Sequence, residues 1–347
     1  MKTIFLTLLS GMLAVAFTFA QAQADDSGTA EKNNALTLVG RIPAPNMTGT
    51  WDHLTVDLAT DRLFASAQED NQVRVFDLNA RKPLFTISGS FDRPQGLYYV
   101  PESNALAVTN GKDGSLHSFN GSTYEPIKTL PLSLGADMMD LDPNTKYLYV
   151  DHGGVDSNRG PGALAIVDSN TWEKVGEVPT EYRPAALQIE THGDRLFVLI
   201  PGLSQVAVVS RRTNQIFARF QLATPAQPIA LALDEPNHRL FVVNRRPASF
   251  NVLDMDTGRP IATLDTIDGV ESMYLDTKLH RLYLTALDGY LQVVQQIDAD
   301  HYKTKARFFT GHHAGTSQFV PNLNILCVAV PPVEGRAAEI WLFQPKP

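Results

Sequence analysis

Cysteine is nearly absent from this sequence, since Cys327 is the only one among 347 residues. A single thiol excludes an intramolecular disulfide, so the folded state must be stabilised by the burial of apolar side chains. The chain can supply this burial, because 44% of its residues are hydrophobic. Cys327 itself lies in the apolar run NILCVAV (324–330), where we expect a buried, unreactive thiol rather than a nucleophile.

Motifs for common reactions are absent as well. No G-x-S-x-G stretch predicts a nucleophile elbow, and the glycine-rich stretch 153–162 lacks the strand-to-helix context of a phosphate-binding loop. Helical periodicity is also missing throughout the chain. These absences leave the catalytic residues unknown, and the sequence is more informative about architecture than about a reaction.

Long apolar runs are missing except at the N-terminus. Residues 4–20 form an apolar stretch after Lys2, and the small-residue pattern at 22–24 follows it. This pattern predicts a signal peptide over 1–24, cut after Ala24, and a periplasmic or secreted protein. The alternative is a membrane anchor, but the short stretch with polar residues inside it favours the signal peptide. Residues 25–35 are polar and predict a flexible leader.

Positive charge is also in short supply. The formal net charge is −8, and removal of the signal peptide with Lys2 changes it to −9. A protein of this charge repels phosphate backbones, so we expect no nucleic-acid partner. The basic pairs at 211–212 and 245–246 are expected to be solvated loop charges rather than a binding stripe.

What the sequence does contain is a repeat. Seven related stretches occur, namely DRLFASA (61–67), NALAVTN (104–110), KYLYVDH (146–152), DRLFVLI (194–200), HRLFVVN (238–244), HRLYLTA (280–286) and NILCVAV (324–330). The leucine in the third position recurs at intervals of 43, 42, 48, 44, 42 and 44 residues. Intervals of this length are typical of β-propeller blades.

Each repeat predicts four strands separated by turns, and the N-terminal segment completes the count. The last repeat offers strands near 316–320, 324–330 and 339–343, and then the chain ends. The strand predicted at 36–43 would serve as the outer strand of this last blade and close the ring. We therefore predict an all-β, seven-bladed propeller of four-stranded blades over residues 36–347.

The repeats resemble a known family. The stretches LAVTN (106–110), LYV (148–150) and LFVVN (240–244) are similar to the bacterial YVTN-type, YncE-like β-propeller repeats. The copies at 61–67 and 280–286 lack the asparagine, and the copy at 324–330 lacks the tyrosine and the threonine. The resemblance implies a periplasmic or secreted propeller, in a family whose members mostly lack an assigned activity. WD40 propellers have a similar period, but their Gly-His and Trp-Asp signals are absent here.

Propeller topology predicts which residues meet at the central channel. The loops that enter the innermost strands and those that leave the second strands share one face, which we call the funnel face. Aligned innermost strands place one residue of each blade at the channel mouth: Asp52, Gly96, Asp137, Ala185, Ile229, Glu271 and Thr316. With their neighbours, these positions predict the following ligand-binding residues: Asp52, His53, Arg93, Gln95, Asp137, His152, Arg183, Arg245, Glu271, His312 and His313.

Several interpretations of this funnel remain open. It suits a small polar ligand or a partner protein. It also suits a divalent cation, with Asp52, Asp137 and Glu271 as the ligands of calcium or magnesium, whereas an imidazole would favour zinc. Alternatively, arginines and backbone amides satisfy the acids, and the mouth holds only water. We assign no cofactor, and calcium is the one that the acids would accommodate.

Two further features bear on this face. The 48-residue interval reflects an inserted loop at 151–162, which is either a lid or a tolerated insertion. His312 and His313 are adjacent, so in a strand only one of them would face the channel.

The sequence thus predicts an exported, monomeric propeller that binds a ligand or a partner protein at its funnel face. The alternative is a metal-dependent lactonase or related hydrolase, resembling gluconolactonase-type propellers that hold calcium with channel carboxylates. A quinoprotein dehydrogenase is disfavoured, because the chain is short for that class and lacks its tryptophan-rich repeats.

Overall fold

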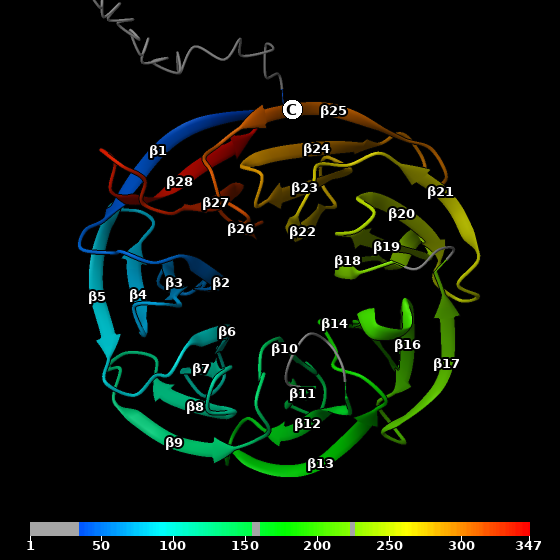
Figure 1. The fold of residues 1–347 in the computed structure, drawn as a ribbon, viewed down its shortest axis with the longest axis horizontal. Helices are drawn as coiled ribbons and strands as arrows, with labels where there is room; N and C mark the ends of the chain where they lie inside the picture. The colour runs from blue at the N-terminus through cyan, green and yellow to red at the C-terminus, as the bar shows by residue number, and fades with distance from the viewer. Residues whose placement is uncertain (1–34, 155–159, 223–225) are drawn as a thin grey trace, which may run out of the picture. The chain divides into compact units, whose positions relative to one another are not determined.

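A computed structural model describes residues 35–154, 160–222 and 226–347, all within one compact unit, Glu31–Pro347. Its strands form seven four-stranded antiparallel sheets arranged as the blades of a β-propeller (Figure 1). The predicted signal peptide and nearly all of the predicted leader lie outside the described residues. Within the described ranges, no helix has the length and hydrophobicity needed to span a membrane.

The first three blades follow one another along the chain. Blade 1 contains β2 (Trp51–Asp57), β3 (Arg62–Ala67), β4 (Gln72–Asp77) and β5 (Lys82–Ser88). Blade 2 contains β6 (Pro94–Val100), β7 (Ala105–Asn110), β8 (Ser115–Asn120) and β9 (Pro126–Pro131). Blade 3 contains β10 (Met139–Leu141), β11 (Tyr147–Gly153), β12 (Gly162–Asp168) and β13 (Glu173–Thr180).

The next three blades repeat this order, and two short 3-10 helices lie between their strands. Blade 4 contains β14 (Ala186–Ile189), β15 (Arg195–Ile200), η1 (Pro201–Leu203), β16 (Gln205–Ser210) and β17 (Gln215–Gln221). Blade 5 contains β18 (Pro228–Asp234), η2 (Glu235–Asn237), β19 (Arg239–Asn244), β20 (Ser249–Asp254) and β21 (Pro260–Leu264). Blade 6 contains β22 (Val270–Asp276), β23 (Arg281–Ala286), β24 (Tyr290–Gln296) and β25 (Tyr302–Phe309).

The last blade closes the ring with strands from both parts of the chain. It contains β26 (Thr316–Val320), β27 (Ile325–Val330), β28 (Ala338–Pro345) and β1 (Leu36–Ala44). β1 pairs antiparallel with β28 from Leu36 opposite Pro345 to Ala44 opposite Ala338. The predicted closure is therefore confirmed, because β1 and the three C-terminal strands form one four-stranded blade. Cys327, in β27, is fully buried as predicted, and burial raises the pKa of its thiol to about 12.

Two structural features of the blades, a buried leucine and a turn residue before it, explain the pattern of the repeat. The marker leucines are 0% exposed in all seven blades, at positions 63, 106, 148, 196, 240, 282 and 326. The residue two positions earlier ends the turn before the second strand, and in six blades it has a positive φ of 47–63°. Aspartate, asparagine and histidine tolerate this backbone region better than most side chains. This explains the D, N and H that open most of the seven stretches.

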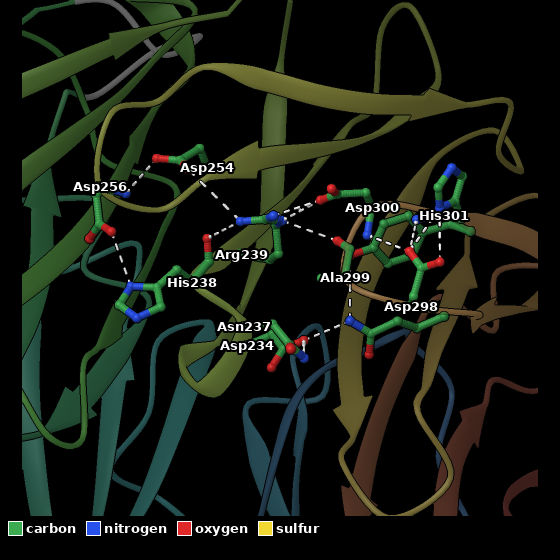
Figure 2. Close-up of polar contacts among 12 residues, drawn as sticks. Asp234, Asn237, His238, Arg239, Asp254, Asp256, Asp298, Ala299, Asp300 and His301 are labelled. Atoms are coloured by element: carbon green, nitrogen blue, oxygen red, sulfur yellow. Dashed lines mark hydrogen bonds and ion pairs between the residues drawn. The ribbon is translucent and has the colours of Figure 1, made fainter.

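The arginine in the second position of the repeat joins neighbouring blades on the face opposite the funnel. Figure 2 shows Arg239 of blade 5 donating to the carboxylate of Asp300, at 2.6 Å, and to the carbonyl of Ala299 in blade 6, at 3.1 Å. Arginines at the same position of other repeats also donate to the following blade. The four that do so are Arg62, Arg195, Arg239 and Arg281.

A hydroxyl near the end of the second strand makes a matching contact on the funnel face. It donates to a backbone carbonyl near the start of the innermost strand of the next blade. The donor and acceptor pairs are Ser66 with Gln95 at 2.7 Å, Thr109 with Asp137 at 2.8 Å, and Thr285 with Gly315 at 2.7 Å. The threonine of the repeat thus fixes the backbone positions at the channel mouth.

Candidate functional site

A cavity of about 790 Å³ occupies the channel between the innermost strands. This volume lies within the roughly 300–1,000 Å³ range of small-molecule sites. Polar side chains gather where the innermost strands begin, and apolar side chains of β14, β18 and β22 line one wall. The cavity therefore joins a charged mouth, on the funnel face, to an apolar wall along the channel.

Irregular strand pairing places the mouth residues. The register between β2 and β3 shifts between Trp51 and Leu54, so Asp52 and His53 have no partners in the ladder. Consecutive side chains of a regular strand point to opposite faces, whereas a bulge allows both to turn the same way. Both Asp52 and His53 consequently line the cavity. Register shifts at the equivalent places in β18 and β22 involve Ile229 and Glu271, which also line it.

The centre of the mouth is a cluster of two carboxylates and an imidazole. Nε2 of His53 lies 3.3 Å from Oδ1 of Asp52 and 3.2 Å from Oδ1 of Asp137. The second oxygen of Asp137 is 3.1 Å from a terminal nitrogen of Arg183, and that of Asp52 accepts a hydrogen bond from Gln68. The cluster joins blades 1, 3 and 4 across the channel.

Two more guanidinium groups complete the mouth. Arg245, which follows β19, is paired with the carboxylate of Glu271 on β22. Arg93, which precedes β6, donates to the side-chain oxygen of Gln68 at 3.4 Å. The mouth thus holds three arginines, and carboxylates contact two of them directly.

Burial and mutual contact shift the pKa values of the central cluster. Burial raises the pKa of Asp52 to about 6, although His53 lowers it. Burial alone would lower the pKa of His53, but Asp52 and Asp137 outweigh it and raise the value to about 10. The pKa of Asp137 is lowered, because the hydrogen bond and charge of His53 and the charge of Arg183 outweigh its burial. Asp137 is therefore ionised and His53 protonated at neutral pH.

Two further acids near the mouth have raised pKa values. Burial raises the pKa of Glu271 to about 6 in spite of the opposing charge of Arg245. Burial and the neighbouring Asp137 raise the pKa of Asp151 well above its usual range. Asp151 is 0% exposed, and its Oδ1 accepts the amide protons of Asp137 and Met138 at 3.1 and 3.0 Å. Asp151 therefore holds the backbone that carries Asp137.

Most of the predicted ligand-binding residues come together in the structure. Those that line the cavity are Asp52, His53, Arg93, Gln95, Asp137, Arg183, Arg245, Glu271 and His313. His152 and His312 do not line it. His152 is buried in β11, where its Nδ1 is 3.4 Å from the amide of Ser133, and burial lowers its pKa to about 4. His312 is exposed and its ring lies 5.0 Å from that of Phe309.

Two parts of this cavity were not predicted from the sequence. Gln68 follows β3, and alignment of the ends of the second strands would have found it. The apolar wall, which includes Leu187, Ile229 and Leu231, was not predicted, because runs of apolar residues in innermost strands are equally typical of the packing between blades. Of the predicted inserted loop 151–162, the segment 155–159 lies outside the described residues.

The predicted metal ligands were Asp52, Asp137 and Glu271, but the structure groups the residues differently. Possible ligand atoms of Asp52, His53 and Asp137 lie within 4.8 Å of one another, while Glu271 pairs with Arg245. Calcium takes an all-oxygen shell, so the imidazole makes this set unsuitable for it. The distances from Nε2 of His53 to both carboxylates are those of a donated hydrogen bond, and a metal would require the lone pair of that nitrogen instead.

Comparisons with known proteins show the fold. Among solved structures, the chain is similar to the hydrazine synthase of Kuenenia stuttgartiensis, with a TM-score of 0.70 and 16% sequence identity. The match covers 82% of this chain and 93% of the other. In all, 1750 chains of solved structures match, so the propeller alone selects no function. No family model and no curated protein matches the sequence.

Proposed function

We propose that this protein is an exported β-propeller that binds a small polar ligand in its central cavity. The observation that carries the proposal is the convergence of three guanidiniums, three carboxylates and an imidazole at the mouth of a cavity of about 790 Å³. Charged groups are expensive to remove from water, and a channel needed only for packing would be filled by apolar side chains. The YVTN-type, YncE-like resemblance and the N-terminal sequence pattern support export.

A thermal-shift screen tests binding. The mature protein would be heated in the presence of small carboxylic acids, amines, sugars and neutral polar compounds, each at millimolar concentration. A ligand that binds only the folded state at about 100 times its Kd stabilises that state by about 2.7 kcal/mol. We expect one class to raise the melting temperature, and Arg183→Gln to abolish the increase.

Arg219→Gln is the matched control. Arg219 pairs with Glu181 at 3.1 Å on the outside of blade 4, away from the cavity. Its replacement should leave ligand binding unchanged. If no compound class raises the melting temperature, or if Arg183→Gln retains the full increase, the cavity is not the binding site that we propose.

Export is tested separately. Expression of the full sequence with its N-terminal segment should give a product outside the cytoplasm whose mass corresponds to cleavage after Ala24. A full-length product in the cytoplasm would contradict this part of the proposal.

The second candidate function is a metal-dependent lactonase or related hydrolase. It is favoured by the three possible ligand atoms of Asp52, His53 and Asp137 within 4.8 Å. Elemental analysis of the purified protein, together with melting curves in EDTA and in added calcium or zinc, separates the two functions. A metal present at one equivalent, with a stabilisation that is lost in Asp52→Asn, would favour the hydrolase.

A further inference from the structure

Much of the hydrogen-bond donor capacity at the mouth is unused. A guanidinium carries about five N–H donors. Among the described residues, Arg183 and Arg245 each use only one terminal nitrogen, toward Asp137 and Glu271. Nε of each is buried without a hydrogen-bond partner there. The two side chains are 25% and 32% exposed, so an incoming oxygen could accept a hydrogen bond from the terminal nitrogens that have no partner.

Both carboxylates of the central cluster already lie against donors, although Oδ1 of Asp137 is buried without a well-formed hydrogen bond. Both oxygens of Asp52 have a partner within the cluster, His53 for one and Gln68 for the other. Both oxygens of Asp137 likewise have His53 or Arg183 at ion-pair distance. An ammonium group at these carboxylates would meet the like charges of His53 and Arg183, whereas a ligand anion would meet N–H groups that no carboxylate contacts. The mouth therefore favours an anion over a cation.

An apolar wall continues directly from the two arginines. Arg183 precedes β14, which contributes Leu187 to the cavity. The amide of Arg245 donates to the carbonyl of Gln227 at 2.8 Å, next to β18, which contributes Ile229 and Leu231 to the same cavity. The donors and the apolar surface are thus supplied by the same two neighbouring blades. A ligand bound to the donors would extend its remaining atoms along this wall.

We infer that the ligand is an amphipathic carboxylic acid, bound as its anion with the carboxylate at Arg183 and Arg245 and the apolar body against β14, β18 and β22. This inference rests on the proposed function and names the ligand class. Arginine suits a carboxylate because its planar N–H groups match the two carboxylate oxygens.

The test compares four probes that differ in one feature each. Isothermal titration calorimetry of the mature protein would measure the Kd of octanoate, octylamine, 1-octanol and acetate. We expect octanoate to bind at least about tenfold more tightly than the other three, since a charge-assisted hydrogen bond and the apolar body each contribute that much. The double variant Arg245→Gln/Glu271→Gln removes a cation without leaving its carboxylate unpaired, and should weaken octanoate binding about tenfold or more.

Two variants separate ligand recognition from folding. Ile229→Ala, which removes apolar surface at the mouth, should weaken octanoate about fivefold and leave acetate unchanged. Arg219→Gln, on the outer strand, should change neither. Melting temperatures of all variants confirm that they are folded.

Each other outcome overturns the inference in a specific way. Octylamine that binds as tightly as octanoate contradicts the anionic head group, and 1-octanol that does so contradicts recognition of the carboxylate. Acetate of equal affinity contradicts the apolar body, and weak binding of all four contradicts the class as a whole. In each of these cases, the thermal-shift screen decides separately whether the protein binds a small polar ligand in its cavity.

Discussion

Replacing Thr109 by valine tests how the repeat positions the mouth. Thr109 is 0% exposed at the end of β7. Its hydroxyl donates to the carbonyl of Asp137 in the next blade and accepts the amide proton of Gly96, both at 2.8 Å. Gly96 needs this partner because the register of β6 against β7 shifts between Pro94 and Leu97. Valine has the same shape as threonine, so Thr109→Val removes the hydroxyl without opening a cavity.

The expected loss of stability follows from these two contacts. Each buried backbone group left without a partner costs about 1–3 kcal/mol. We therefore expect the free energy of unfolding to fall by about 2–4 kcal/mol. An unfolding entropy of about 2.1 cal/mol/K per residue over roughly 310 residues converts this loss into a decrease in melting temperature of about 3–6 °C.

Differential scanning calorimetry measures this decrease, and two variants serve as controls. Thr109→Ser keeps the hydroxyl and should lower the melting temperature much less than Thr109→Val. Ser66→Ala loses a single contact, to the carbonyl of Gln95 at 2.7 Å, and should lower it about half as much. A decrease below about 1 °C for Thr109→Val, or an equal decrease for Thr109→Ser, would refute the idea that this hydroxyl joins blades 2 and 3.

Three further predictions concern stability. Arg195→Met should lower the free energy of unfolding by about 2–4 kcal/mol in chemical denaturation, because Arg195 is largely buried and makes contacts in two blades. The exposed control, Arg219→Met, should lower it by less than about 1 kcal/mol. Leu240→Ala should cost about 2–5 kcal/mol in the same assay, and Leu58→Ala, at a position 48% exposed, should change stability by no more than about 0.5 kcal/mol. Burial raises the pKa of Asp140 to about 6, so the folded state binds this proton more tightly than the unfolded state does. Stability should therefore fall as the pH rises from about 4 to about 6. Asp140→Asn should reduce this fall in melting curves recorded across that range.

The periodic part of the sequence predicted the fold well. Every blade has one fully buried leucine, and six of the seven blades have a turn residue with positive φ two positions before it. The closure by β1 was also predictable, because a ring of four-stranded blades lacked one strand at its C-terminal end. The contacts of the repeat arginine could not be predicted, since its partners, such as Asp300 for Arg239, lie about 60 residues away.

The candidate site was predictable in position but only partly in composition. Alignment of the innermost strands located Asp52, Asp137 and Glu271 at the mouth, where the structure also places them. The contacts among the mouth residues could not be predicted from the sequence, because they depend on which blades lie opposite each other across the channel. His152 shows the limit of such alignment. It occupies the last position of its repeat, as Asn244 does in another, and both side chains are buried and do not line the cavity.

Differences among the repeats therefore carry more functional information than their similarities. The position that begins each innermost strand is an acid in three blades, and it is alanine in a fourth and isoleucine in a fifth, at 185 and 229. A scaffold built only to close a ring would have no physical reason to differ so strongly at one equivalent position. The charged groups at the mouth and the apolar wall along the channel together suit the amphipathic ligand that we propose. This asymmetry within a regular ring is the physical basis for placing the ligand in the channel rather than on the outer strands.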